Sequence, residues 1–150
     1  MGDAFVVDPS ANLETSMEFI DSYRKEAISF NREPQVVVMR DSWVGRTAQE
    51  AVNDYGPALG KAYQYYWKKG LKAYQGIKSE NEVSLASLGK NRAILGSPED
   101  CIKEYRRWHD ATGADYFILR MRHAHGYGPS HDKIMESIKL FGESVIPNCT

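Results

Sequence analysis

The chain has 150 residues, of which 42% are hydrophobic and 26% are charged, and this suits one globular domain. The formal net charge of −1 argues against a strongly basic or acidic surface, so we expect neither nucleic acid nor an anionic membrane as partner. No apolar run approaches the ~20 residues that span a bilayer. Two cysteines, Cys101 and Cys149, without a CxxC pair indicate thiols in a reducing cytoplasm.

The first predicted element is a short strand at residues 4–7, a continuous apolar run that ends at Asp8. Such a run is typical of a strand buried on both faces. Ser10 or Asn12 then begins a helix, because both side chains can accept a hydrogen bond from a free backbone N–H of the first turn. Apolar residues at helical spacing form its predicted buried stripe: Leu13, Met17, Ile20, Tyr23, Ala27 and Phe30.

A second strand is predicted at residues 36–44, where three consecutive valines favour extended backbone. Thr47 and Glu50 form a capping-box pattern that begins the next helix. Gly56–Pro57 is expected to kink or interrupt this helix, since proline cannot donate to the helical ladder. The aromatic cluster at residues 63–67 is interpreted as helix packing or an oligomer surface rather than a surface for stacking a cofactor.

Residues 71–95 are polar and irregular, so we interpret them as an excursion from the core that is suited to act as a mobile lid. Residues 97–100, Ser-Pro-Glu-Asp, are typical of a helix start, and Gly113 suits the end of that helix. A third strand is predicted at residues 116–119. Ser130 caps a last helix.

The order of these elements alternates strands with helices and predicts three parallel strands, adjacent in sequence order, with the helices on one side. A small doubly wound binding protein is a rival interpretation, but residues 8–11 lack its glycine-rich phosphate turn. Three strands leave one face and two edges bare, so we expect self-association, unless residues 71–95 fold back over that face. The side chains expected on the bare face, or near it, are Phe5, Val7, Val37, Met39, Phe117 and Leu119.

Three segments near the end of the chain carry a resemblance to a known family. Residues 96–102 read GSPEDCI, residues 111–116 read ATGADY, and residues 138–147 read IKLFGESVIP. In this order and spacing they resemble the C-terminal end of the bacterial luciferase family. Residues 38–44, followed by the TxxEA pattern at 47–51, look like the seventh strand of that family and the helix after it.

The resemblance covers most of the chain and is weakest at residues 60–92. It implies an α/β fold: the last three strand–helix units of a (β/α)8 TIM-type barrel, here a single domain over residues 1–150. It also implies a monooxygenase that uses reduced FMN, or in some branches a deazaflavin, supplied by a separate reductase. In the FMN-dependent members a flavin hydroperoxide formed with O2 oxidises a small organic substrate.

The first five strands of the family barrel have no counterpart in this alignment, so we expect the chain alone to bind flavin weakly or not at all. Autonomous catalysis is therefore in doubt. The alternative is a non-catalytic partial-barrel subunit that self-associates or pairs with another chain.

The active site of a (β/α)8 barrel lies at the carboxyl ends of the strands. His123 and His125, after the third strand, are candidate catalytic proton donors, because histidine titrates near neutral pH. Arg40 and Asp41, near the end of the second strand, are candidate catalytic residues that would line the pocket. The ordinary alternatives are a solvated loop for the histidines and a pair facing the helices for Arg40 and Asp41.

Candidate contacts to a flavin phosphate follow from positive charge and from free backbone N–H groups. Gly96 and Ser97 precede a helix, whose N-terminus can hold an anion. Arg120 and Arg122 can bind a phosphate or sulfonate in a bidentate manner. An ordinary helix cap is the alternative for the first pair. No metal site is expected, because no acidic or cysteine partner lies near the histidines.

Overall fold

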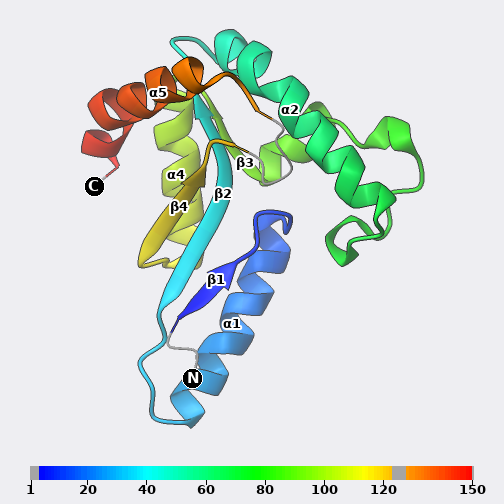
Figure 1. Ribbon diagram of the computed structural model, residues 1–150. Coiled ribbons are helices and arrows are strands. Elements are labelled where there is room, and N and C mark those ends of the chain that lie inside the picture. The colour runs from blue at the N-terminus through cyan, green and yellow to red at the C-terminus, as the bar shows by residue number, and fades with distance from the viewer. Residues whose placement is uncertain (1–3, 123–127, 150) are drawn as a thin grey trace.

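The computed structural model describes residues 4–122 and 128–149 and contains one parallel sheet (Figure 1). Its strands are β1 (Phe5–Val7), β2 (Val36–Val44), β3 (Ala93–Gly96) and β4 (Tyr116–Arg120). Its helices are α1 (Leu13–Ser29), α2 (Ala48–Lys68), α3 (Leu85–Leu88), α4 (Pro98–Thr112) and α5 (His131–Leu140). Short 3-10 turns interrupt the segment between α2 and β3, and a π-helical turn at Phe141–Val145 extends α5.

Strand β2 is the centre of the sheet and pairs in parallel with each of the others. The pairing aligns Val37 with Tyr116 of β4 and also with Val6 of β1, so β1 and β4 lie along opposite edges of β2. Asp41 is aligned with both β3 and β4, which places β3 on the same edge as β1 (Figure 1). The expected parallel arrangement of the three predicted strands, with β2 between β1 and β4, is confirmed.

The expected number of strands is wrong, because residues 93–96 form a fourth strand. Ala93, Ile94 and Leu95 make a short apolar run directly before Gly96, and the polar residues upstream concealed it in the sequence. The expected interruption at Gly56–Pro57 is also wrong, since α2 is helical from Ala48 to Lys68. One missing ladder bond is tolerated there, because α2 packs along its length against the core.

The helix boundaries agree with the capping signals in the sequence. Asn12 accepts a hydrogen bond from the backbone N–H of Thr15 at 2.9 Å and is the N-cap of α1. Ser97 and Asp100 form a reciprocal capping box at the start of α4. Gly113 ends α4 in the left-handed region at φ 54°, where a side chain would be strained. Local chemistry therefore determines where these helices begin and end.

Two hydrophobic cores lie on opposite faces of the sheet. The first core packs α1 and α4 against one face through Ile20, Val38 and Trp108. The second core packs α2 and the segment at residues 71–91 against the other face, at the carboxyl end of β2, around Trp43. The expectation that all helices cover one side is therefore wrong, and several residues of the segment at 71–91 are packed in the second core.

The sheet face opposite α1 and α4 is called the inner face. At the amino ends of the strands it presents Val6, Val37, Met39, Tyr116 and Ile118, which alternate with the helix-covered residues. Val37 and Met39 were expected there. The other side chains expected on this face lie on the helix-covered face instead: Phe5, Val7, Phe117 and Leu119.

None of the helices in residues 4–122 and 128–149 combines the length and the apolar character that crossing a membrane requires.

Candidate functional site

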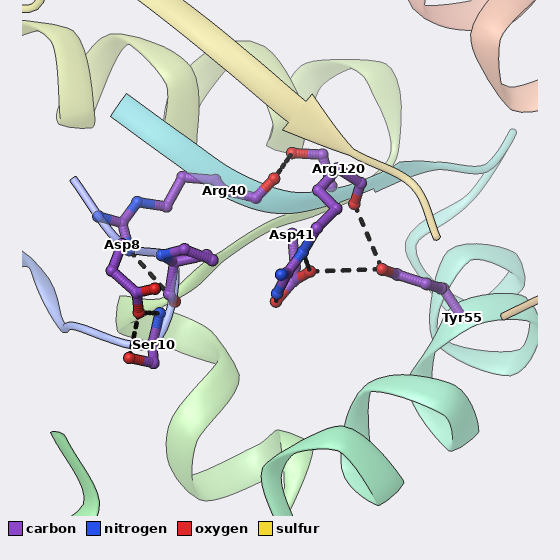
Figure 2. A network of polar contacts seen from close by, with 8 residues as sticks. Asp8, Ser10, Arg40, Asp41, Tyr55 and Arg120 are labelled. Carbon is purple, nitrogen blue, oxygen red and sulfur yellow. Dashed lines mark hydrogen bonds and ion pairs between the residues drawn. The ribbon is translucent and has the colours of Figure 1, made fainter. Parts of the chain in front are cut away.

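The carboxyl ends of three strands bring charged side chains together at one end of the sheet, called the mouth (Figure 2). Asp8 directly follows β1, Asp41 lies in the second half of β2, and Arg120 is the last residue of β4. The register aligns Asp41 with Arg120, so their side chains emerge on the same face. That face is the inner face of the sheet. It is apolar at the amino ends of the strands and carries the charged side chains at the mouth.

Asp41 and Arg120 form a bidentate ion pair. The Nε atom of Arg120 donates to Oδ1 of Asp41 at 2.7 Å, and its Nη2 atom donates to Oδ2 at 3.0 Å. The side chain of Asp41 is 2% exposed and that of Arg120 is 19% exposed. Burial alone would lower the pKa of Arg120, but the hydrogen bonds and charge of Asp41 outweigh it and raise that pKa above its ordinary value. Arg120 therefore stays protonated.

The hydroxyl of Tyr55 completes this network from α2 (Figure 2). It lies 3.3 Å from the carbonyl oxygen of Arg120 and 3.5 Å from Oδ1 of Asp41, and it can donate to either. Burial, with a contribution from Asp41, raises the pKa of Tyr55 well above its ordinary value, so the phenol stays protonated. Its ring stacks on Trp43 with centroids 5.3 Å apart. Tyr55 thus joins the second core to the ion pair.

A small pocket of about 60 Å³ opens beside the ion pair. Its lining residues are Asp8, Pro9, Ser10, Asp41, Tyr63, Tyr66, Leu71, Tyr74 and Arg120. The hydroxyls of Tyr63 and Tyr74 are buried and have no hydrogen-bond partner among the described residues. Burial raises the pKa of both tyrosines, so both hydroxyls stay protonated. An unpaired buried hydroxyl costs about 1–3 kcal/mol, so a hydrogen bond from either tyrosine to a polar ligand would recover part of that cost.

Arg40 lies on the opposite face from Asp41, because successive side chains of a strand alternate. Its guanidinium donates to the carbonyl of Ala11 at 2.7 Å and to the hydroxyl of Ser16 at 3.1 Å. The same group lies 3.7 Å from the ring centroid of Trp108. Burial lowers the pKa of Arg40 to about 9, against the opposing charges of Asp8 and Asp41. Arg40 therefore holds the loop between β1 and α1 and does not line the mouth pocket.

Gly96 and Ser97 lie at the end of β3, away from the mouth pocket. The carboxylate of Asp100 accepts from the backbone N–H of Ser97 at 3.0 Å and from its hydroxyl at 2.8 Å. A Cβ atom on Gly96 would lie 2.8 Å from that same carboxylate oxygen. The side chain of Asp100 therefore occupies the place that an anion would take at this helix N-terminus.

The remaining sequence candidates do not join the ion pair in the described structure. Arg122 is exposed and is absent from the lining of the mouth pocket. His123 and His125 lie outside the described residues. Among the residues that are described, no group of three or more His, Cys, Asp or Glu side chains is arranged to hold a metal ion.

Four residues of the site escaped the sequence analysis: the three tyrosines Tyr55, Tyr63 and Tyr74, and Arg92. Arg92 is buried and donates from Nε to the carbonyl of Ser10 at 2.8 Å, which fixes the loop beside the pocket. The tyrosines belong to α2 and to the segment after it, whose position over the mouth depends on tertiary packing. The one available signal was the aromatic cluster at residues 63–67, interpreted as helix packing or an oligomer surface, and Tyr63 of that cluster packs in the second core.

The described mouth does not fit a flavin. Sites for ligands of that size have volumes of roughly 300–1,000 Å³, whereas the mouth pocket has about 60 Å³. A hollow of about 290 Å³ between α2 and α5 and one of about 670 Å³ beside α3 and α4 are larger, but neither is lined by Asp41 or Arg120. The mouth pocket formed by residues 4–122 and 128–149 therefore has room for a small group.

No protein-family model matches the sequence, and a search of curated proteins finds no match. Solved structures do match. One is the oxygenating constituent of 3,6-diketocamphane monooxygenase from Pseudomonas putida, a type II Baeyer–Villiger monooxygenase in complex with FMN. It is 16% identical with a TM-score of 0.68, and the match covers 97% of this chain and 42% of that one.

Two further solved structures match this chain over a similar share of their length. The coenzyme F420-dependent tetrahydromethanopterin reductase of Methanopyrus kandleri is 14% identical with a TM-score of 0.65, and the match covers 100% of this chain and 46% of that one. An EDTA monooxygenase from Chelativorans is 16% identical with a TM-score of 0.61, over 97% and 41% of the two chains. This chain thus spans less than half the length of these structures. It shares its fold with part of each of these enzymes, which confirms the resemblance at the level of fold.

Proposed function

We propose that this chain forms part of the mouth of a luciferase-like flavin-dependent monooxygenase, which oxidises a small organic substrate with O2. The observation that carries the proposal is the ion pair of Asp41 and Arg120 beside the unpaired hydroxyls of Tyr63 and Tyr74. These groups gather at the carboxyl ends of parallel strands, where (β/α)8 enzymes hold their active sites. The solved structures support the kind of enzyme through their shared fold.

The chemistry of the mouth pocket suits a small polar group of the substrate that carries no negative charge. Asp41 is paired with Arg120, and Asp8 adds a second carboxylate to the lining, so the pocket disfavours an anionic ligand. Tyr63 and Tyr74 stay protonated and can each donate one hydrogen bond or accept one. A volume of about 60 Å³ holds roughly four water-sized groups, enough for the polar head of an organic molecule.

The proposed cofactor is reduced FMN from a separate reductase, with a deazaflavin as the alternative. Solved structures of the same fold support both, one in complex with FMN and one dependent on coenzyme F420. Because the mouth pocket is too small for a flavin, the proposal assigns flavin binding to a barrel completed by further strands. His123 and His125 keep their proposed role as proton donors, and Arg122 its proposed role as a phosphate contact. The proposed location is the cytoplasm.

The second candidate is a non-catalytic partial-barrel subunit that self-associates or pairs with another chain. The observation that favours it is that the charged groups near the strand ends already have partners within this chain. Arg120 is paired with Asp41, and Asp100 fills the anion position beside Gly96 and Ser97. A flavin phosphate would have to displace one of these contacts.

Flavin titrations separate the two candidates. FMN fluorescence is followed while the purified chain is added, and the same titration is repeated with a fusion carrying the first strand–helix units of the EDTA monooxygenase. We expect no binding by the chain alone and saturable binding by the fusion, weakened by Asp41→Asn. A fusion that folds cooperatively but binds neither FMN nor a deazaflavin would exclude the enzyme and favour the non-catalytic subunit.

A further inference from the structure

The amino end of the inner face is apolar and exposed. Val6 is 47% exposed, Tyr116 66% and Ile118 43%, and the half-buried Val37 and Met39 lie between them on β2. The register places all five on one face of three adjacent strands, so they form a continuous patch. Parallel sheets are found almost only with both faces covered, so this patch is a surface that lacks its cover.

The chain itself covers only the other end of this face. Helix α2 and the segment at residues 71–91 pack over Trp43, Ala93 and Leu95, at the carboxyl ends of β2 and β3. None of the five patch residues belongs to that core. Folding back of the segment at 71–91 therefore protects the mouth and leaves the amino end of the inner face exposed.

The outer edges of the sheet are also unpaired in the described residues. β1 and β4 each pair only with β2, so the far side of each strand presents free backbone N–H and C=O groups. Open edges of this kind pair readily with another strand. The patch and the two edges together form a surface that is apolar in the centre and bordered by hydrogen-bonding groups of the backbone.

We propose that a second copy of this chain covers the amino end of the inner face, in a two-fold dimer. A two-fold axis lets each patch cover the other. The patch holds no charged side chain, and the net charge of −1 leaves little repulsion between copies. This chain covers 42–46% of two of the matching structures, so two copies approach the content of one barrel.

The proposed dimer also completes the mouth. Asp41 and Arg120 lie on the same face as the patch, two residues further along their strands than Met39 and Ile118. Arg120 remains 19% exposed, so this chain by itself does not cover the ion pair completely. The partner copy would therefore form part of the wall of the mouth. The dimer does not depend on the proposed flavin chemistry.

Sedimentation equilibrium of the purified chain at roughly 10–100 micromolar tests the proposal. We expect a species of twice the 17.0 kDa chain mass. Ile118→Lys and Tyr116→Lys should shift it to monomer, with Kd raised at least tenfold. Both side chains are exposed in the single chain, so neither change should prevent folding, and far-UV circular dichroism checks this. Met135→Lys is the matched control, because Met135 is an exposed apolar residue on α5.

A folded wild-type chain that sediments only as monomer would overturn the proposal. So would a dimer that survives both Ile118→Lys and Tyr116→Lys but is lost in Met135→Lys, because the interface would then lie on α5. Binding of flavin is measured separately and enters neither outcome, so this test and the flavin titrations can fail independently.

Discussion

Replacing Asp41 with asparagine tests whether the ion pair holds the mouth together. The change keeps the shape of the side chain but removes its charge and one acceptor oxygen, leaving Arg120 without its counter-ion. Breaking a buried pair by removing one partner costs about 3–5 kcal/mol. Because Arg120 is 19% exposed and can turn toward water, we expect a cost at or below the lower end of this range, about 2–3 kcal/mol.

Urea unfolding followed by circular dichroism measures the free energy of unfolding of the wild type and the variant. Glu143→Gln is the matched control, since Glu143 pairs with Lys139 at 3.8 Å and both side chains are largely exposed. We expect that control to change stability by less than about 0.5 kcal/mol. Equal effects of Asp41→Asn and Glu143→Gln would refute the reasoning, because burial would then make no difference to the pair.

Three further predictions follow from the packing. A Cβ atom on Gly45 would lie 2.6 Å from the backbone nitrogen of Ala51, so Gly45→Ala should lower the free energy of unfolding by about 1–3 kcal/mol. Gly60 lies inside α2 with open space around its Cβ position, so Gly60→Ala should raise the free energy of unfolding by about 0.5–1 kcal/mol in the same urea assay. Tyr63→Phe should lower the free energy of unfolding by less than about 0.5 kcal/mol, or raise it by up to about 1 kcal/mol, because the hydroxyl that it removes is unpaired. A decrease of about 2 kcal/mol would contradict this. Burial raises the pKa of Cys101 from 9.0 to about 12, so the contribution of the protonated thiol to stability is present below pH 9 and is lost as the pH rises toward 12. Cys101→Ala should therefore reduce the fall of the unfolding free energy with pH in this alkaline range. An unchanged dependence of the unfolding free energy on pH would contradict the prediction.

Local signals predicted much of the fold. Asn12, Thr47, Ser97 and Ser130 each accept a backbone hydrogen bond at the start of a helix, as their positions before apolar stripes indicated. The alternation of strands and helices predicted parallel pairing. These features depend on neighbours within a few residues, so the sequence carries them directly.

The faces of the strands could not be assigned in this way. Alternation shows that Val6 and Val7 point to opposite sides, but only the packing of α1 and α4 decides which side is covered. Val7 is buried for this reason and Val6 is exposed. The sequence left Arg40 and Asp41 either lining the pocket or facing the helices as a pair, and the same alternation separates them.

The sequence by itself determined where the main helices begin, the parallel order of β1, β2 and β4, and a resemblance that the shared fold of solved structures supports. Only the tertiary structure decided that residues 93–96 pair as a strand, that α2 covers the mouth, and that Tyr55, Tyr63 and Tyr74 meet Asp41 and Arg120 there. Those contacts join residues more than ten positions apart, and they form because burial of aromatic surface outweighs the weak local preferences of the segment at 71–91.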